Sequence, residues 1–329
     1  MSVPALFKGR LSIPVIGSPM FIASTPELVI AQCKAGIVGS FPALNARPKE
    51  VLEDWLKRIA GELGDYAAKH PDKPVAPFAV NQIAHHSNDR LMHDVEICVK
   101  HKVPMFITSL KAPAEVVQAA HSYGGIVMHD VINVRHARKA IEAGVDGLIL
   151  VCAGAGGHAG THSPFALVSE VRRFFKGAIA LSGAISNGAQ VLAAQAMGAD
   201  FAYIGTRFLA TEEAHVVPEY KQMLIESAAA DIVYTSLFSG VQANYLKKSV
   251  AASGLDPENL PEADKSKMNF GSEGTGHKKV WRDIWSAGQG TGTIDDVLPV
   301  ADLVARMRRE YDAARASLAA GVAAAQAAE

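Results

Sequence analysis

A glycine-rich segment with one histidine carries the residues of this chain that are best suited to chemistry. It covers residues 154–160 and places His158 shortly after an apolar run at 147–151. An imidazole titrates near neutral pH, so His158 can remove a proton or bind a developing anion. Because glycine lets a backbone lie close to a ligand, the flanking glycines favour contact with a flat ring. We expect His158 to be the catalytic residue.

Other structures compete for the same segment, and a flexible loop stays open as an alternative. A dinucleotide-binding turn lies in the first βα unit and opens a helix at once. Here five expected strands precede the strand at 147–151 that leads into the segment, and residues 161–164 delay the next helix. A metal site is not expected either: His158 and His162 are four residues apart, but the glycines disfavour a helix and no third ligand is evident.

Two later strand ends have the composition of a phosphate site. Each apolar run stops at small residues and is followed by a helix start, so main-chain N–H groups converge where a phosphate can sit. The residues concerned are Ser182, Gly183 and Ala184 at the first strand end, and Ile204, Gly205 and Thr206 at the second. This spacing predicts a phosphate-bearing cofactor on a (β/α)8 barrel.

The chain lacks the usual motifs of hydrolysis and phosphoryl transfer. It has no GxSxG elbow, no Walker loop and no clear pair of carboxylates. A cofactor must therefore supply the chemistry. A single phosphate cradle, glycines beside a planar ring and one nearby histidine suit FMN best. A phosphate-binding barrel without flavin, such as an isomerase, remains as an alternative of another class.

Eight short apolar runs alternate with helical stretches, which is typical of a parallel sheet covered by helices. The expected strands are 13–18, 37–41, 75–80, 105–108, 126–129, 147–151, 178–182 and 201–205. We expect an α/β fold, a TIM (β/α)8 barrel built from residues 1–211 and 296–329. Residues 212–295 read as helices and loops, so we expect a smaller helical lid domain there. A final helix over 300–328 carries an apolar stripe, formed by Val300, Leu303, Val304 and Met307, that can return to the barrel wall.

The reactive end of such a barrel is the rim formed by the C-terminal ends of its strands. Besides the segments already named, the residues expected at this rim are Ser18, Pro19, Met20, Asn81, Gln82, Thr108, Ser109, His129 and Asp130.

Composition and charge exclude several classes of partner. The 329 residues are 49% hydrophobic and 20% charged, which suits a globular chain with a large core. With 32 basic and 33 acidic side chains, no charge surplus attracts nucleic acid or an anionic membrane, so neither is an expected partner. Three scattered cysteines without a CxxC pair argue against disulfides. The N-terminal segment lacks the apolar core of a signal peptide, and we expect a cytoplasmic protein.

Taken together, several motifs resemble those of the nitronate monooxygenase family, formerly called 2-nitropropane dioxygenases. The relatives of that family include FMN-dependent NADH:quinone reductases and the FMN enoyl reductases of fatty-acid synthesis. The motifs that carry the resemblance are Gly17-Ser18-Pro19-Met20, residues 152–160, Ser182-Gly183-Ala184, residues 197–200, residues 204–208 and residues 284–289. The resemblance spans nearly the whole chain.

The resemblance implies a role for each matching residue. Met20 would back the flavin, Asn81 would hydrogen-bond its ring system, and His158 matches the catalytic histidine. That histidine assists proton removal from a nitroalkane or holds the anionic nitronate. Residues 285–289 would bring the helical region back over the flavin. The implied cofactor-binding residues are Ser18, Pro19, Met20, Asn81, His129, Asp130, Ala155, Gly156, Gly157, Ser182, Gly183, Ala184, Ile204, Gly205, Thr206 and Gln289.

The chain departs from its relatives at three of these motifs. Relatives often have Gln-Gly where this chain has Gly17-Ser18, and Ser-Gly-Gly where it ends in Ala184. The second change is mild if the backbone φ angle of Ala184 is negative, because the main-chain donor then survives. Several relatives place a lysine after the histidine of the fifth strand, where this chain has Asp130. A cation there would stabilise reduced anionic flavin, and Asp130 removes that charge.

The leading hypothesis is a nitronate monooxygenase, in which the substrate reduces FMN and O2 completes the oxidation to a carbonyl compound and nitrite. The alternative within the superfamily is NAD(P)H-dependent reduction of a quinone or an enoyl thioester, where nicotinamide stacks on the flavin. A flavin-binding protein without turnover is a third reading. The substrate is expected to be a small molecule, and a homodimer through the helical region is left open by the sequence.

Overall fold

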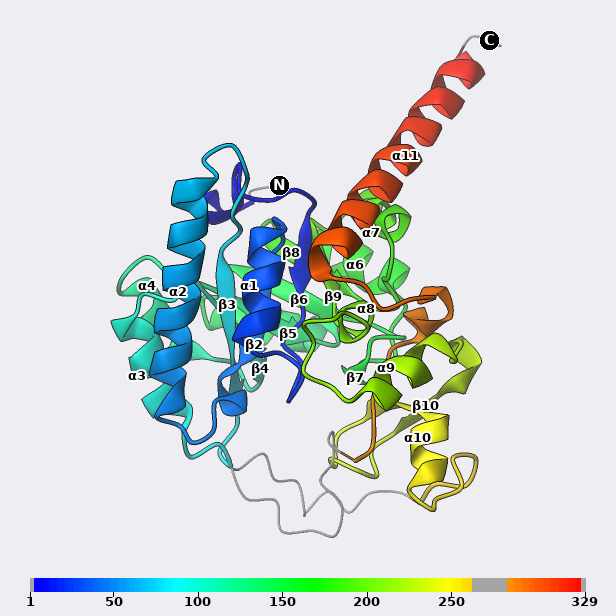
Figure 1. Ribbon diagram of the computed structural model, residues 1–329, viewed down its shortest axis with the longest axis horizontal. Helices are drawn as coiled ribbons and strands as arrows, with labels where there is room; N and C mark the ends of the chain where they lie inside the picture. The colour runs from blue at the N-terminus through cyan, green and yellow to red at the C-terminus, as the bar shows by residue number, and fades with distance from the viewer. Residues whose placement is uncertain (1–2, 262–282, 327–329) are drawn as a thin grey trace.

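Eight parallel strands form the centre of the molecule, which a computed structural model describes for residues 3–261 and 283–326 (Figure 1). Buried apolar side chains fill nearly every strand, as expected of strands covered on both faces. The strands are β1 (Val15–Gly17), β2 (Gly39–Pro42), β3 (Phe78–Ala84), β4 (Met105–Leu110), β5 (Ile126–Val131), β6 (Gly147–Val151), β8 (Ala178–Ser182) and β9 (Phe201–Ile204). All eight expected strands are confirmed, with ends that shift by a few residues.

The sheet closes into a barrel between its first and second strands. Hydrogen-bonded neighbours follow the order β1-β9-β8-β6-β5-β4-β3-β2, and every neighbouring pair is parallel. A bridge between Ile16 and Val38 joins the two edges, where the Gly17 N–H donates to the Val38 carbonyl at 2.8 Å. The predicted TIM-barrel fold is therefore confirmed.

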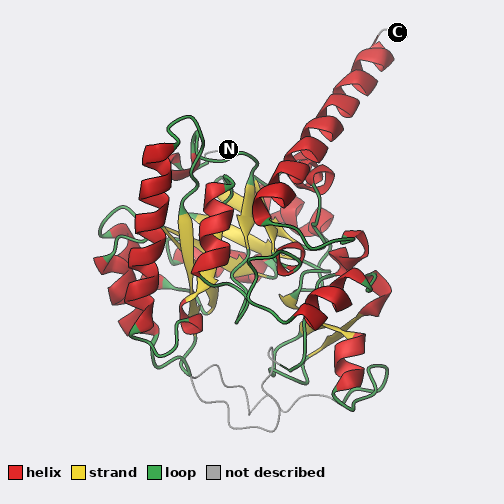
Figure 2. Cartoon of the chain, viewed as in Figure 1, coloured by secondary structure: helices red, strands yellow, loops and turns green. Residues whose placement is uncertain are grey.

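Helices surround the strands and connect each one to the next (Figure 2). The covering helices are α1 (Pro26–Lys34), α2 (Val51–Lys69), α3 (Leu91–Lys100), α4 (Ala114–His121), α5 (Val134–Glu142), α6 (Pro164–Arg172), α7 (Gly188–Ala196) and the short α8 (Thr206–Leu209). Local signals fix their ends: Pro26 and Pro164 occupy first turns, and Asn133 and Asn187 cap α5 and α7 through their side-chain oxygens.

Side chains alternate between the barrel interior and the layer under the helices. Ile107 and Met128 lie in the interior cluster, whereas Phe106 and Val127 lie in the cluster between strands and helices. This alternation is the period of two that every β-strand imposes. At the C-terminal ends of β3, β4 and β5, the inward-facing residues are Asn81, Ser109 and Asp130.

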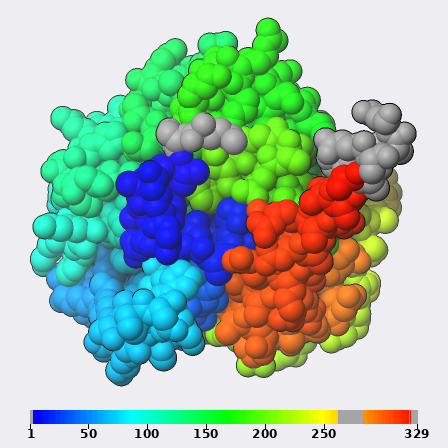
Figure 3. All heavy atoms as spheres, turned by 90° about the horizontal axis from the view of Figure 1, so that it is seen from above, coloured from blue at the N-terminus to red at the C-terminus, as the bar shows by residue number. Residues whose placement is uncertain are grey.

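The opposite end of the barrel is closed by the N-terminal segment. A 3-10 turn, η1 (Ala5–Phe7), places the Phe7 ring 4.9 Å from the ring of Phe201, the first residue of β9. Seen from this side, the segment lies in blue at the centre of the face, between the cyan, green and orange parts of the chain (Figure 3). With this end plugged, only the C-terminal end of the strands can hold a site.

Residues 212–295 contain strands as well as helices, which corrects the expectation of helices and loops alone. Described here are α9 (Pro218–Ile225), η3 (Ala229–Asp231), β10 (Ile232–Thr235), β11 (Ala243–Leu246), α10 (Lys247–Ala252) and η5 (Gln289–Thr293). Strands β10 and β11 form an antiparallel sheet with β7 (Gly157–His158) of the glycine-rich segment. The strands were missed because their third partner comes from the barrel. Residues 262–282 of the expected lid lie outside the described residues.

The last helix, α11 (Val300–Gln326), begins against the barrel and then leaves it. Its apolar stripe, Val300, Leu303, Val304 and Met307, is buried beside α7 and α1, as expected. Its second half projects away from the body, and Leu318 there is exposed (Figure 1). Within the described ranges, no helix is both long and apolar enough to cross a membrane.

Candidate active site at the mouth of the barrel

A cradle of small residues lies where β6, β8 and β9 end. It is a hollow of about 280 Å³, partly open to solvent, between three barrel loops and the start of η5. The lining residues are Gly154, Ala155, Gly156, Ser182, Gly183, Ala184, Ile185, Ser186, Tyr203, Gly205, Thr206, Gly288 and Gly290. The structure thus brings together both predicted phosphate segments and the glycine-rich loop. Ile204, also expected in the cofactor site, does not line the cradle, because its side chain is buried in the cluster under α1 and α11.

Main-chain donors converge in this cradle. Among the residues that the structure describes, no acceptor bonds the N–H groups of Gly183, Ala184, Gly205 or Thr206. Gly183 has a φ of +148°, and a Cβ there would lie 2.8 Å from the carbonyl oxygen of Ala153. Only glycine fits such a position. Several N–H groups directed at one small space are suited to an anion such as a phosphate.

Ala184 adopts a left-handed backbone conformation. The change from the glycine of relatives was expected to be mild only if the φ angle here were negative, and it is positive. Its φ is +54°, a region that costs a non-glycine residue about 1–2 kcal/mol. The main-chain N–H still belongs to the cradle. The departure from Ser-Gly-Gly therefore strains the loop without removing the donor.

A strap from residues 288–290 covers the cradle. The Gln289 N–H donates to the Gly154 carbonyl at 2.8 Å, and the Gly288 N–H donates to the Thr206 Oγ at 2.9 Å. The approach is so close that a Cβ on Gly288 would lie 2.5 Å from the Gly154 oxygen. Gln289 is thus placed beside the predicted site, as the sequence suggested for residues 285–289.

The loop after β1 forms another side of the mouth. A Cβ on Gly205 would lie 3.3 Å from the Ser18 Cβ and 3.6 Å from the Met20 sulfur, so the loop of Ser18, Pro19 and Met20 borders the cradle. Asn45 fixes this loop: its amide donates to the carbonyls of Met20 and Ser24 at 3.0 and 2.9 Å and accepts from the Ile22 N–H at 2.9 Å. Sequence reasoning missed Asn45, which lies in a 3-10 turn rather than at the end of a strand.

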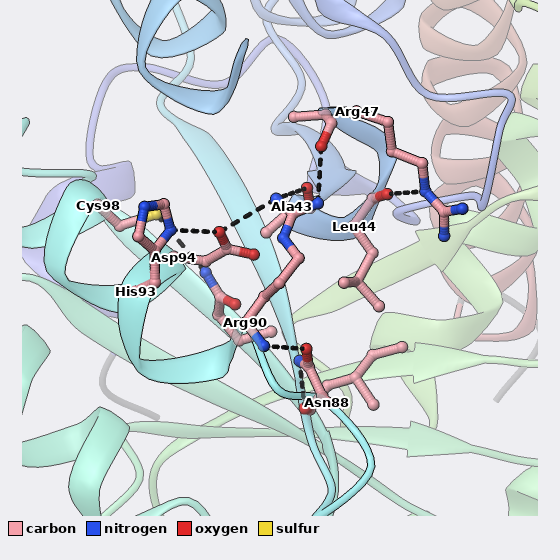
Figure 4. A network of polar contacts seen from close by, with 11 residues as sticks. Ala43, Leu44, Arg47, Asn88, Arg90, His93, Asp94 and Cys98 are labelled. Carbon is pink, nitrogen blue, oxygen red and sulfur yellow. Dashed lines mark hydrogen bonds and ion pairs between the residues drawn. The ribbon is translucent and has the colours of Figure 1, made fainter. Parts of the chain in front are cut away.

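A buried ion pair supports that turn, η2 (Ala43–Asn45) (Figure 4). The Arg90 guanidinium donates to the carbonyls of Ala46 and Ala43 at 2.8 and 3.4 Å and pairs with Asp94 at 3.1 Å. Arg90 is only 8% exposed and Asp94 is fully buried. A buried arginine that satisfies main-chain carbonyls fixes the backbone it binds. The Arg90–Asp94 pair therefore holds the turn from which Asn45 reaches the Met20 loop.

His158 lies in β7, where the glycine-rich loop joins the outer sheet. Its Nε2 is 2.9 Å from the Ser239 Oγ, and the Asn244 amide donates to the Ala155 carbonyl at 2.6 Å. Tyr234 donates to the Ala159 carbonyl at 2.7 Å. These contacts give the loop a fixed conformation, against the flexible-loop alternative. Burial lowers the pKa of His158 to about 4, so the imidazole is neutral at pH 7.

Asn81, Ser109 and Asp130 form a chain of hydrogen bonds across the inner wall of the mouth. The Asn81 amide donates to the Ser109 Oγ at 3.1 Å, and Ser109 donates to Asp130 Oδ2 at 2.7 Å. Asp130 Oδ1 is buried without a partner among the described residues. Burial raises the pKa of Asp130 to about 7, although the Ser109 hydrogen bond opposes this rise. Electrostatic contact with Asp130 also raises the pKa of Tyr203, which lines the cradle.

His129 is not brought to the mouth, although it was expected in the cofactor site. Its side chain faces the helices, as do those of Val127 and Val131, two residues before and after it. Its Nδ1 lies 2.8 Å from the Thr108 Oγ. Burial and the nearby His136 of α5 lower its pKa to about 4. Adjacent strand residues face opposite ways, so only one of His129 and Asp130 can face the interior. Gln82 and Thr108 also face the helices.

No cluster of three histidine, cysteine or carboxylate side chains suited to a metal ion occurs within residues 3–261 and 283–326. The donors of the cradle are main-chain N–H groups and hydroxyls, which bind anions rather than cations. The converging main-chain donors of the cradle fit the phosphate of a phosphate-bearing cofactor.

Comparisons with known proteins show the family and the fold of the chain. A sequence profile of the nitronate monooxygenase family matches residues 8–310. The nitronate monooxygenase of Paraburkholderia phytofirmans is 28% identical over 90% of this chain and 92% of that protein. Two solved structures share the fold. FabK from Thermotoga maritima superposes with a TM-score of 0.76, at 23% identity over 97% of this chain and 99% of that one. Nitroalkane oxidase from Streptomyces ansochromogenes superposes with a TM-score of 0.73, at 21% identity over 95% and 100%.

Proposed function

The chain belongs to the nitronate monooxygenase family and is an oxidoreductase, and from this premise we propose that it uses FMN to oxidise alkyl nitronates with O2 to a carbonyl compound and nitrite. The observation that carries the proposal is that four main-chain N–H groups without an acceptor among the described residues lie at the same end of the barrel as His158 and the inward-facing Asn81. An anion cradle beside a neutral imidazole is what a flavin phosphate and a proton-transfer step need.

The cradle would hold the FMN phosphate through the N–H groups of Gly183, Ala184, Gly205 and Thr206. The Met20 loop, fixed by Asn45, would support one side of the ring, and the loop at 155–157 would lie against it. Bound FMN would supply the electron acceptor that the side chains of this site lack. The described part of residues 212–295 would act as the lid, because Ser239, Asn244 and the strap all contact the glycine-rich loop.

His158 would accept the proton of a neutral nitroalkane and hold the nitronate anion, whether formed in the site or bound from solution. The Ser239 hydroxyl donates to the Val241 carbonyl at 3.0 Å, so it accepts from His158 Nε2 and keeps the imidazole proton on that atom. Nδ1 is then the basic nitrogen. A neutral imidazole at pH 7 can take a proton from a nitroalkane carbon. The resulting nitronate anion favours the charged imidazolium, which raises the pKa of His158 in the complex.

Turnover in air tests the proposal. The protein is reconstituted with FMN and mixed with propyl-2-nitronate while O2 uptake and nitrite are measured. The proposal predicts nitrite release with O2 consumption and without any nicotinamide. If nitrite does not form, and NADH or NADPH instead drives reduction of a quinone or an enoyl thioester, the alternative activity is established and the proposed one is wrong.

A further inference from the structure

We propose that Asp130 is a proton-carrying residue of the cofactor site, which takes up one proton when the bound flavin is reduced and thereby balances part of the added negative charge. This inference rests on the proposed function, because it requires a flavin at the mouth of the barrel.

Asp130 belongs to the inner wall of the barrel mouth. It faces the barrel interior at the end of β5, on the same wall as Ser109 and Asn81. Tyr203 of β9 also belongs to the barrel interior and lines the phosphate cradle. The carboxyl group therefore lies between the cradle and the Asn81 side of the mouth.

The two carboxyl oxygens have different surroundings. Oδ2 accepts a hydrogen bond from Ser109 at 2.7 Å, whereas Oδ1 is buried and has no partner among the described residues. An ionised oxygen in that setting is unfavourable because its desolvation is not compensated. A proton on Oδ1 removes the charge and turns this oxygen into a hydrogen-bond donor.

The groups that surround Asp130 inside the barrel are neutral, so Asp130 is the side chain of this wall that titrates near neutral pH. From β4 it meets the neutral Ser109, from β9 the neutral Tyr203, and from β6 the apolar Ile149 beside it in register. His129 and His136 lie on the helix side of β5. No lysine or arginine in the described ranges contributes to the pKa of Asp130, which burial brings to about 7. Near neutral pH the residue can therefore both hold and lose a proton.

The proposed step balances as follows. Two electrons from the substrate, together with one proton, convert oxidised FMN to its reduced anionic form. A second proton, from solvent, binds the ionised carboxylate of Asp130. Two protons are then taken up per two electrons in the pH range between the pKa of Asp130 in the oxidised protein and its higher pKa in the reduced protein.

Equilibrium reduction of the FMN-loaded protein between pH 5 and pH 9 tests the inference. Wild type is compared with Asp130→Asn, Ser109→Ala and Asp65→Asn, a control on the exposed face of α2. Above about pH 7, the equilibrium constant for FMN reduction should fall as pH rises. For wild type and the control, each pH unit should lower it by a factor ten times larger than for Asp130→Asn. This difference is about 30 mV per pH unit for a two-electron couple. Ser109→Ala should move the steeper range to higher pH, because it removes the hydrogen bond that stabilises the carboxylate.

The outcomes separate the two proposals. If wild type binds no FMN, the proposed function is wrong. If FMN binds and wild type and Asp130→Asn show the same pH dependence, Asp130 carries no redox-linked proton and the inference is overturned. If Asp130→Asn does not fold, proton uptake by the wild-type holoprotein on anaerobic photoreduction decides: two protons per flavin at pH 8 support the inference, and one proton contradicts it.

Discussion

The Nε2 of His158 lies 2.9 Å from the Oγ of Ser239, a residue 81 positions later in the chain. This contact joins the glycine-rich loop of the barrel to the outer sheet built by β10 and β11. The candidate base is therefore oriented from outside the barrel, and both elements must fold correctly before the site is complete.

Replacing His158 by Asn should lower turnover with the neutral nitroalkane 2-nitropropane by about 10²–10⁴-fold, because the amide has no basic nitrogen to accept the proton of the nitroalkane carbon. FMN binding should be retained, since the cradle is built by other residues. Steady-state kinetics and FMN titration measure the two effects. The matched control is His162→Asn, which alters an exposed histidine four residues away. Unchanged turnover in His158→Asn would refute the assigned role.

Ser239→Ala should reduce kcat by about tenfold while KM changes less, because the imidazole loses the partner that fixes its proton on Nε2. The pH profile of kcat provides the second readout. It should change shape in this variant, since both ring nitrogens can then carry the proton. A variant with wild-type kcat and pH profile would mean that Ser239 does not orient His158.

Gly183→Ala should abolish FMN binding or weaken it more than tenfold. The new Cβ would lie 2.8 Å from the Ala153 oxygen, at a φ of +148° that only glycine adopts readily. The loop must then move, and its N–H leaves the cradle. Fluorescence titration with FMN gives the affinity. Wild-type affinity in this variant would show that the phosphate is held elsewhere.

Ala184→Gly, at the next residue, should have the opposite effect on the protein. Glycine relieves the left-handed strain at a φ of +54°, so the free energy of unfolding should rise by up to about 1 kcal/mol. Denaturant unfolding measures the change, and FMN affinity should remain close to that of wild type. Destabilisation by glycine would contradict the assigned backbone strain.

Asp130→Asn should remove a pH dependence of stability. Between about pH 4 and pH 7, folded wild type keeps a proton on Asp130 that the unfolded chain has released, so this residue lowers the free energy of unfolding as pH rises. The slope is about 1.4 kcal/mol per pH unit. His158 acts in the opposite direction between about pH 4 and pH 6.5, because its pKa is lowered on folding.

The difference between wild type and Asp130→Asn isolates the aspartate, since both proteins contain His158. The free energy of unfolding is measured for both FMN-free proteins at pH 5 and pH 8. The stability of the variant relative to wild type should be greater at pH 8 than at pH 5. An equal difference at both pH values would mean that Asp130 has an ordinary pKa in the folded protein.

The barrel was predictable because its signals are local. Apolar runs buried on both faces defined the strands, and the small residues after β8 and β9 marked the cradle. The direction in which neighbouring strand residues face was predicted less well from the sequence. His129 and Asp130 were both expected in the cofactor site, yet alternation turns them to opposite sides of β5. Fixing the register needed the interior cluster, which only the folded chain reveals.

The supporting residues of the site could not be found from sequence. Asn45 reaches the Met20 loop from a 3-10 turn that Arg90 and Asp94 hold together, and Asn244 reaches Ala155 across 89 positions. Such contacts depend on tertiary geometry and leave no local pattern. The left-handed φ of Ala184 has the same origin, because the surrounding loop imposes a conformation that alanine alone disfavours.

Anaerobic stopped-flow mixing of the FMN-loaded protein with propyl-2-nitronate, NADH and NADPH in separate experiments tests the central claim most directly. Flavin absorbance reports whether each compound reduces the cofactor in a single step. The account predicts rapid bleaching by the nitronate alone and a much slower reaction in His158→Asn. Rapid bleaching by a nicotinamide with none by the nitronate would contradict it and assign the site to a reductase.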